Sequence, residues 1–422
     1  MIQLIRGFKD ILPGEIELWQ KIEAVVAALF QDFGFHEIRI PIMEKTALFA
    51  RSIGENTDIV EKEMYTFPDR KGDLITLRPE ATASVVRAYI QHKLYAKEAI
   101  QKFYTIGPMF RRERPQKGRY RQFYQINAEV FGVAAPQIDA QLIIMLSTLL
   151  DRLEVKNTTV HINSLGCFEC RPGFKAALKE FLGECRDQLC SDCLRRMEKN
   201  PLRVLDCKVP DCKKAMEKAP ALLDYLCSPC QEHFEQVQKL LNIFKISYII
   251  DQHLVRGLDY YNRTTFEIQT SALGAQSAVA GGGRYDGLVK TLGGSDQPAI
   301  GFAIGFDRLV EIIRQNSEIQ KAGPDLFIAA LGETAKTKAF DWLINFNLAG
   351  LKTEMEFSPK SLKTQMKRAN RIGAKQVLII GENELVQESV ILRDMSTKEQ
   401  IMIPISNLVE QVLAQFGLKG EN

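Results

Sequence analysis

The chain has 422 residues, of which 45% are hydrophobic and 25% charged, and its 55 Lys and Arg nearly balance 52 Asp and Glu to leave a net charge of +3. This is the composition of a globular protein with ample core, and the length suffices for roughly three domains. A charge so close to zero excludes a global basic field, so any anion site must be local. The N-terminal sequence lacks the apolar segment of a signal peptide, and no apolar run approaches the ~20 residues that span a bilayer. We therefore expect a cytoplasmic protein with no membrane span.

The first expected elements are a helix, a strand broken by proline, and a hairpin. Apolar residues recur at helical spacing up to Gly34, a natural stop, which predicts a helix over about 15–33. The strand that follows contains Pro41, which cannot donate to a ladder, so the strand should end, bulge or lie at an edge there. A hairpin is predicted next, with strands near 64–67 and 74–77.

A helix is predicted in RPEATASVVRAYI, with Pro79 suited to its first position. Glu80 in the first turn would complement the helix dipole, and this structural reason alone accounts for it. The functional alternative is that Glu80 and Thr82, at a helix start beside a sheet, bind an ammonium and a hydroxyl or imidazole.

The segment from Phe103 to Gly132 carries the strongest local signal. Two strand-like stretches flank a loop that Pro115 and Gly118 keep from being helical, which predicts a long antiparallel hairpin. The loop holds six cations within eleven residues: Arg111, Arg112, Arg114, Lys117, Arg119 and Arg121. Side chains alternate between the two faces of a strand, so the second strand of this hairpin should place five residues on one face: Phe123, Gln125, Asn127, Glu129 and Phe131. Such a face beside an arginine cluster can hold one ligand by both its anionic and its cationic groups; an exposed, charge-rich hairpin is the alternative.

All nine cysteines lie between Cys167 and Cys230, in a segment of about 167–235 that interrupts the α+β pattern as an insertion would. Eight form close pairs, which in a reducing cytosol indicates metal or free thiols rather than disulfides. The spacing C-x2-C-x19-C-x2-C falls in the range of four-thiolate zinc sites, and it groups Cys167, Cys170, Cys190 and Cys193. The remaining four pair members could form a second site: Cys207, Cys212, Cys227 and Cys230. Reduced thiols that pack a small insertion remain an equal alternative.

Two glycine-bearing segments follow the insertion. LVRGLDYYNRTTFEI predicts a turn at Arg256 and a strand opened by Tyr260 and Tyr261. AGGGRYDGLV is a glycine run in which the backbone can approach a ligand or another strand closely. AIGFAIGFDRLVEII predicts a tight strand and then a helix with Arg308 in its first turn, where a cation opposes the dipole and often has an anion to bind.

A linker is predicted at Lys321–Pro324, after which strands and helices alternate. This pattern predicts a separate α/β domain over 325–422 with a mostly parallel sheet. Its second helix carries a basic face formed by Lys360, Lys363, Lys367, Arg368 and Arg371. A nucleic-acid backbone would suit this face, although a solvated helix surface would look similar.

Together these segments resemble a class II aminoacyl-tRNA synthetase of the histidyl-tRNA synthetase family, over nearly the whole chain. The segment around Pro41 resembles the first class motif, associated with the dimer interface. FRRERPQKGRYRQF resembles the second motif and GFAIGFDRL the third. LVRGLDYY and AGGGRYDGL are similar to the two histidine-specific motifs, and KRANRIGAKQVLIIGENEL is similar to the anticodon-binding domain of one class II subgroup.

The resemblance implies an α+β fold: a class II catalytic core built on an antiparallel sheet over 1–322, interrupted by the small Cys-rich insertion, and a C-terminal α/β anticodon-binding domain over 325–422. It implies a histidine–tRNA ligase that converts L-histidine and ATP to histidyl-adenylate and pyrophosphate, then transfers histidine to the 3′ end of tRNA(His). It also implies a homodimer and Mg²⁺ on the β- and γ-phosphates. Zinc in the insertion rests on cysteine spacing alone.

The resemblance also implies roles for single residues. Histidine would be bound by Glu80, Thr82, Gln125, Glu129, Arg256, Tyr260, Tyr261 and Tyr285. ATP would be bound by Arg111, Glu113, Arg119 and Arg308. The tRNA would be bound by Arg114, Gln116, Arg119, Lys363, Lys367 and Arg371. Arg111 and Arg256 would be catalytic at the α-phosphate, where Arg256 would partly replace a metal found in related synthetases.

Two other functions fit parts of the sequence. A catalytically silent, synthetase-like regulatory subunit of ATP phosphoribosyltransferase would be expected to lose active-site arginines and the anticodon domain, yet this chain keeps Arg111, Arg256, Arg308 and the 325–422 region. A non-enzymatic, zinc-bearing nucleic-acid-binding protein would explain the cysteines and the basic helix. It would leave LVRGLDYY and GGGRYDGL without purpose.

Overall fold

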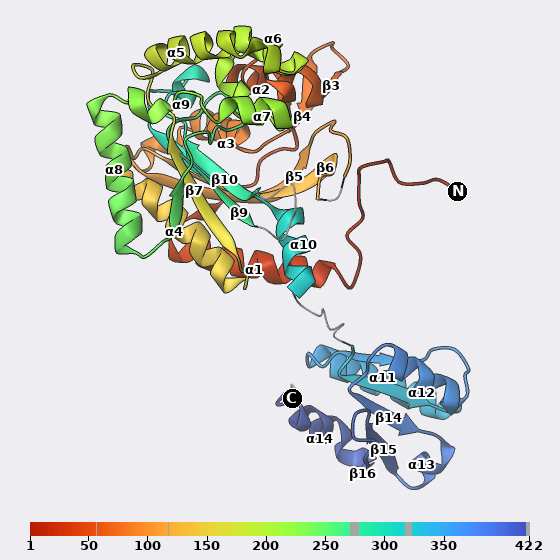
Figure 1. The fold of residues 1–422 in the computed structure, drawn as a ribbon. Coiled ribbons are helices and arrows are strands. Elements are labelled where there is room, and N and C mark those ends of the chain that lie inside the picture. The colour runs from red at the N-terminus through yellow and green to blue at the C-terminus, as the bar shows by residue number, and fades with distance from the viewer. Residues whose placement is uncertain (56, 117, 271–277, 317–322, 419–422) are drawn as a thin grey trace. The chain divides into compact units, whose positions relative to one another are not determined.

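The computed structural model describes residues 1–55, 57–116, 118–270, 278–316 and 323–418 (Figure 1). Residues 1–318 and 319–422 form two compact units, which are described separately. The predicted linker falls partly outside the described residues. No helix within the described ranges is both long and apolar enough to cross a membrane.

The first unit is built on an eight-stranded sheet with the order β1-β5-β6-β11-β10-β9-β7-β8. The strands are β1 (His36–Glu37), β5 (Gln101–Phe110), β6 (Gln122–Phe131), β11 (Ala299–Gly305), β10 (Ala278–Arg284), β9 (Asn262–Thr270), β7 (Thr158–Ser164) and β8 (Tyr248–Ile250). All neighbours from β5 to β7 pair antiparallel, and only the edge strands β1 and β8 pair in parallel. The predicted antiparallel core and its long β5–β6 hairpin are confirmed.

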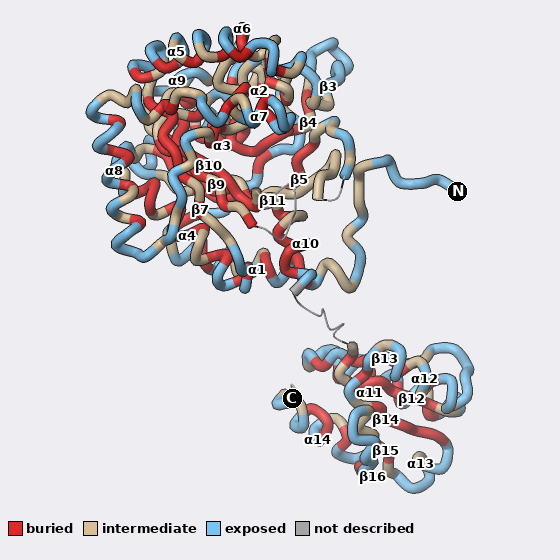
Figure 2. The backbone as a smooth tube through the Cα atoms, in the orientation of Figure 1, coloured by how far each residue is buried: buried red, intermediate tan, exposed pale blue. Residues whose placement is uncertain are grey.

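Helices cover the sheet and bury its central strands (Figures 1 and 2). Figure 1 shows α1 (Ile16–Asp32), α4 (Pro136–Arg152) and α8 (Ser228–Ile243) along one side of the sheet. The predicted first helix is confirmed, because Trp19, Val26 and their apolar neighbours form its buried stripe. The other side carries α2 (Thr46–Ile53), α3 (Thr82–Gln91) and α9 (Leu288–Thr291).

A small sheet of β2 (Met43–Lys45), β4 (Leu74–Leu77) and β3 (Tyr65–Pro68) includes the second predicted hairpin. Pro41 lies in the break between β1, which ends at Glu37, and β2, which begins at Met43, so the proline interrupts the strand as expected, although β1 already ends four residues before it. The predicted helix start at Pro79 is wrong, because α3 begins at Thr82. The reason is the Glu80 side chain, whose carboxylate accepts hydrogen bonds from the Thr82 and Ala83 N–H groups at 2.7 and 2.9 Å. A residue that caps the first free N–H groups in this way must precede the helix.

The Cys-rich insertion folds as short helices with an apolar core of their own. Its helices before α8 are α5 (Arg171–Glu184), α6 (Ser191–Lys199) and α7 (Pro210–Met216), joined by short 3₁₀ turns that include η4 (Pro201–Val204). Figure 1 shows α5, α6 and α7 grouped beyond α2 and α3, on the side of the sheet opposite α1. Phe174, Leu178 and Leu182 form part of this core together with several cysteines.

The second unit is a five-stranded sheet with the order β13-β12-β14-β15-β16. Its elements are β12 (Leu326–Ala330), α11 (Glu333–Leu348), β13 (Thr353–Met355), α12 (Leu362–Arg371), β14 (Gln376–Ile380), α13 (Glu382–Val386), β15 (Ser389–Asp394), β16 (Gln400–Pro404) and α14 (Leu408–Gln415). The predicted mostly parallel sheet is wrong: β12 pairs in parallel with β13 and β14, but β14–β15 and β15–β16 are antiparallel. The connections after β14 are too short for the dozen or more residues that a parallel crossover needs.

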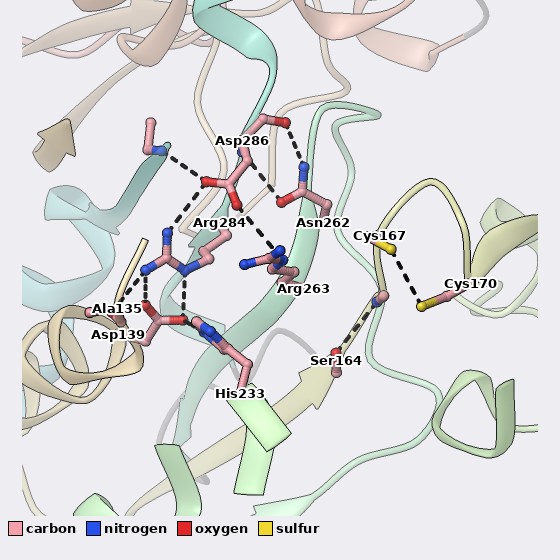
Figure 3. Close-up of polar contacts among 12 residues, drawn as sticks. Ala135, Asp139, Ser164, Cys167, Cys170, His233, Asn262, Arg263, Arg284 and Asp286 are labelled. Carbon is pink, nitrogen blue, oxygen red and sulfur yellow. Dashed lines mark hydrogen bonds and ion pairs between the residues drawn. The ribbon is translucent and has the colours of Figure 1, made fainter. Parts of the chain in front are cut away.

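A buried ionic cluster ties β10 to two helices of the first unit (Figure 3). Arg284 and Asp139 have fully buried side chains, and the guanidinium meets the carboxylate through Nη2 at 2.6 Å and Nε at 3.0 Å. His233 on α8 lies 2.8 Å from the Asp139 Oδ2, the oxygen that also accepts from the Arg284 Nε. Arg284 also donates to the carbonyls of Val133 and Ala135, so its charge is neutralised and its donors are used. The cluster fixes the strand that carries the glycine run.

Replacing Asp139 with Asn should destabilise the first unit by about 3 kcal/mol or more, because it removes the fully buried counter-ion of Arg284 and leaves only the partly exposed Asp286 carboxylate, 3.3 Å away. Denaturant unfolding of the full chain measures the loss. Asp139→Leu combined with Arg284→Met is the matched control, since it removes both charges and should cost much less. An Asp139→Asn variant as stable as the native chain would show that the pair does not hold β10.

Candidate active site

One cavity in the first unit brings together residues that lie far apart in the sequence. Its walls come from β6, β10 and β11, the start of α3, the hairpin loop between Arg111 and Arg121, and the irregular segment 254–261. Ten of the residues expected to bind histidine or ATP line it: Glu80, Thr82, Arg111, Glu113, Arg119, Gln125, Arg256, Tyr260, Tyr261 and Arg308. Glu80, Thr82 and the two tyrosines gather near Glu129, whereas Arg111, Arg119 and Arg308 gather around Glu113.

The polar end of the cavity is backed by Glu129 of β6, which is only 1% exposed. The Thr82 hydroxyl donates to one oxygen of its carboxyl group at 2.6 Å, and the Tyr285 hydroxyl donates to the other at 2.5 Å. Burial raises the pKa of Glu129 to about 8, although both hydroxyl groups act to lower it. Burial also raises the pKa of neighbouring Tyr261 to about 12, so that phenol stays neutral and can donate.

Two glycines let long side chains lie flat on the sheet. A Cβ built at Gly281 of β10 would lie 2.5–2.6 Å from three atoms of the Arg256 guanidinium. At Gly301 of β11 a Cβ would collide with the Glu129 carboxyl group. The predicted close approach in the glycine run is therefore made by the protein's own Arg256, which also forms an ion pair with Glu267, the residue opposite Gly281 on β9.

Apart from the Glu113 Oε2, which is ion-paired with Arg119, three buried polar atoms of cavity-lining residues find no hydrogen-bond partner among the described residues: the Gln125 Oε1, the Asn127 Oδ1 and the Arg256 Nε. All three residues line the cavity. Because an unpaired buried polar group costs about 1–3 kcal/mol, such a group marks a place where a ligand completes the bonding. Asn127 received no role from the sequence, although the period of two on β6 already placed it between Gln125 and Glu129.

The opposite end of the cavity is cationic. The Arg111 Nε donates to the Pro79 carbonyl at 2.9 Å, and its guanidinium lies 5.2 Å from the centre of the Phe123 ring. Arg308 donates to the carbonyls of Gly118 and Ala278 at 3.3 and 2.8 Å, so it spans from the hairpin loop to β10. Burial, followed by repulsion from Arg119, lowers the pKa of Arg308. An anion bound here would relieve that repulsion.

Glu113 is the acidic residue within this cationic end. Its carboxylate forms an ion pair with Arg119 and lies 3.9 Å from Arg111. It thereby holds both guanidinium groups at the mouth of the hairpin loop.

The residues expected to bind tRNA lie outside the cavity, apart from Arg119. Arg114 and Gln116 are exposed on the hairpin loop, and Lys117 lies outside the described residues. In the second unit, Lys363, Lys367 and Arg371 are exposed at intervals of four along α12. Arg368 does not share this basic face as predicted, because it pairs with Glu354 and Glu356 at 3.2 and 3.0 Å.

Eight cysteines of the insertion form two clusters, but not with the predicted membership. The outer cluster contains Cys167, Cys170, Cys227 and Cys230, and the inner cluster contains Cys190, Cys193, Cys207 and Cys212. The predicted grouping by sequence order is wrong because the insertion leaves and rejoins the core at one place. The first cysteine pair lies just before α5 and the last pair lies at the start of α8. The two pairs therefore meet where the insertion joins the rest of the unit (Figure 3 shows the first pair).

The sulfur atoms in each cluster lie at the spacing of a tetrahedral site. Within each cluster all four Sγ atoms lie within 4.8 Å of one another. Individual separations are 3.4, 3.6 and 3.8 Å in the outer cluster and 3.9 Å between Cys190 and Cys207. Four thiolates ~2.3 Å from one zinc ion stand about 3.8 Å apart. Each cluster could therefore hold a metal.

Comparison with known proteins agrees with this arrangement. A family model described as Histidyl-tRNA synthetase matches residues 7–309, and an Anticodon binding domain model matches residues 325–415. The chain is 60% identical over 414 residues to a histidine–tRNA ligase of Desulfatibacillum aliphaticivorans, covering 98% of this chain and 99% of that protein. It is 59% identical over 423 residues to the ligase of Desulfosudis oleivorans, with 100% of both chains covered.

A crystal structure of apo S. aureus histidyl-tRNA synthetase superposes with a TM-score of 0.82 at 35% identity, covering 97% of this chain and 99% of that one. With its antiparallel sheet beneath the cavity and its C-terminal domain, the molecule has the architecture of a class II aminoacyl-tRNA synthetase. Within that class, the chain belongs to the histidyl-tRNA synthetase family.

The raised pKa of Glu129 predicts a pH-dependent stability. The unfolded chain ionises this group near 4.5 and the folded chain near 8, so the folded state binds more protons between these values. The free energy of unfolding should therefore fall as pH rises from about 4.5 to about 8, by at most ~1.4 kcal/mol per pH unit from this group.

Glu129→Gln should remove this part of the slope, measured as unfolding free energy against pH. Glu232→Gln, a change of an exposed carboxylate on α8, is the control and should leave the slope unchanged. Parallel profiles for native protein and Glu129→Gln would contradict the raised pKa.

Proposed function

We propose that the chain is a histidine–tRNA ligase, which activates L-histidine with ATP and then transfers histidine to tRNA(His). The observation that carries this proposal is the single cavity with a buried carboxyl end and an arginine-rich end. One end suits an amino acid with a polar ring, and the other suits a triphosphate.

At the polar end, Glu129 and Tyr261 take the imidazole ring, assisted by Tyr285 from behind. A neutral imidazole offers one donor and one acceptor, which a carboxyl group and a phenol can satisfy together. An apolar amino acid of similar shape would leave these buried groups unpaired, which provides selectivity. The α-ammonium and carboxylate meet other polar groups that line the cavity: Glu80, Thr82, Gln125, Tyr260 and Arg256.

In the first step a carboxylate oxygen of histidine attacks the α-phosphorus of ATP. The bond from that phosphorus to the β-phosphate oxygen breaks, which yields histidyl-adenylate and pyrophosphate. Arg111 and Arg256 stabilise the charge that develops at the α-phosphate, while Arg119 and Arg308 hold the distal phosphates. Positioning and charge stabilisation suffice for such a transfer, and this explains why arginines predominate.

In the second step a hydroxyl group of the terminal ribose of tRNA attacks the histidyl carbonyl carbon. The bond to the adenylate oxygen breaks, AMP leaves and the hydroxyl proton is released. Arg114, Gln116 and Arg119 on the hairpin loop contact the acceptor end. Mg²⁺ would be held mainly by the β- and γ-phosphates and would neutralise their charge, with Glu113 the carboxylate placed to contribute an oxygen.

We assign residues 1–322 to a catalytic domain with its insertion at about 167–235 over the acceptor arm, and 325–422 to an anticodon-binding domain. The exposed cations of α12, Lys363, Lys367 and Arg371, support the latter assignment. The proposed location is the cytoplasm, where both tRNA and ATP are present.

The active molecule in this proposal is a homodimer. The small sheet next to Pro41 exposes the large apolar side chains of Ile42, Met43, Phe67 and Leu74, and a second copy of the chain would cover them.

Each cysteine cluster in this proposal binds one structural Zn²⁺. The sulfur spacing supports it, and the ninth cysteine, Cys185, belongs to neither cluster. A thiolate site supplies folding energy to a small subdomain whose apolar core is limited.

The ligase function predicts exchange of labelled pyrophosphate into ATP that depends on histidine and on no other amino acid. Arg256→His should reduce this exchange by about 100-fold or more, because it removes a preorganised charge at the α-phosphate. Arg314→Ala, at an exposed site on α10 (Phe306–Asn316), should exchange normally. Folded protein without histidine-dependent exchange would exclude the ligase and favour a regulatory or nucleic-acid-binding role.

The zinc proposal predicts two zinc ions per chain in protein purified without chelator, measured by elemental mass spectrometry. Cys193→Ser should lower the content to one, because three thiolates hold zinc far less tightly than four. Cys185→Ser should retain two. Well under one zinc per native chain would instead indicate reduced thiols without metal.

A further inference from the structure

The segment that carries Arg256 and Tyr261 has no regular secondary structure. It runs between β8, which ends at Ile250, and β9, which begins at Asn262. A segment without ladder or helix bonds needs other contacts to fix its backbone. In the described structure many of those contacts come from the insertion.

The insertion contacts this segment at three points. The Arg203 Nη1 donates to the carbonyl of Arg256 at 2.9 Å, and the Asn200 side chain donates to the Asp259 carboxylate at 2.8 Å. Arg171 donates to the carbonyl of Tyr261 and, at 3.2 Å, to that of Leu165. Two of the three residues of the segment proposed to bind substrate, Arg256 and Tyr261, are thus held by their own backbone carbonyls.

The same part of the insertion also binds the wall next to the cavity. Arg196 forms an ion pair with Asp58 at 2.6 Å, and Arg195 lies 3.4 Å from Glu61. Ile59, between these two acidic residues, lines the cavity. The insertion therefore contacts the wall of the cavity through defined ion pairs.

Each contacting residue lies close in sequence to a cysteine of a cluster. Cys193 and Cys207 of the inner cluster bracket the stretch with Arg196, Asn200 and Arg203. Cys170 of the outer cluster directly precedes Arg171. The bracketed stretch is only the end of α6 and the short η4 turn, which would not hold its shape alone.

We propose that the two metal clusters position the histidine-binding segment, with Arg171, Asn200 and Arg203 as positioning residues. The proposal rests on the ligase function and on metal binding as proposed above. Metal fixes the inner stretch and the start of α5, and these hold the carbonyls of Arg256 and Tyr261 so that both side chains face the cavity. The insertion thus acts on histidine activation itself, before any tRNA binds.

The first test is Arg203→Ala in the pyrophosphate exchange assay without tRNA. Losing this charge-assisted hydrogen bond should raise the KM for histidine about tenfold, with a smaller effect on the KM for ATP. Zinc content and thermal stability should remain those of the native chain, and Arg203→Lys should recover part of the loss. Arg186→Ala, at an exposed site of the insertion, is the control. Native-like KM values for Arg203→Ala would overturn the proposal.

The second test compares Cys193→Ser with Cys185→Ser in the same assay. Cys193→Ser should lose one zinc and show the raised KM for histidine, while Cys185→Ser should show neither change. Loss of zinc with unchanged exchange kinetics, or native protein without zinc, would refute the positioning role and leave the ligase function intact. Absence of histidine-dependent exchange in the native protein would instead refute the ligase function.

Discussion

The site depends on one buried carboxyl group. Glu129 extends from β6 over Gly301 of the neighbouring strand, where no side chain could be tolerated, and receives hydroxyl groups from Thr82 and Tyr285. These three residues come from a strand, from the start of α3 and from the end of the glycine run. A carboxyl group in such a place is costly, and its raised pKa is the measure of that cost. Thr82 and Tyr285 hold the Glu129 carboxyl group in place to form a hydrogen bond with a bound ligand.

The surrounding fold keeps this group and the arginines in register. The β5–β6 hairpin carries Glu129 and Gln125 on its strand and the arginines on its loop, so one rigid element sets the distance between the two ends of the cavity. The buried Arg284–Asp139 pair fixes β10, against which the Arg256 guanidinium packs at Gly281. The insertion fixes the segment that bears Arg256 from the opposite direction. Precision at the cavity therefore comes from elements far apart in sequence.

Most of the architecture could be predicted because it follows local rules. Periodicity predicted the helices and the hairpin, and Pro41 lies in the break between two strands, as expected of a residue that cannot donate to a ladder. The failures concern long-range geometry or competing side chains. The spacing of the cysteines in the sequence could not show that the first and last pairs come together where the insertion joins the rest of the unit. Helical spacing predicted that Arg368 belongs to a basic face, but the fold places Glu354 and Glu356 beside it and they pair with its guanidinium. In the site, Asn127 was on the predicted face, but only the cavity shows that its oxygen lacks a partner.

The direct test of the central claim is the ionisation of Glu129 itself, followed by carboxyl ¹³C NMR in protein labelled at glutamate. Glu129→Gln identifies the resonance. Without ligand the midpoint should lie near 8. Saturating histidine should lower it, because an imidazole N–H donates to the charged form and stabilises it. A midpoint near 4.5 without ligand, or one that histidine leaves unchanged, would contradict the account of how this family member selects its amino acid.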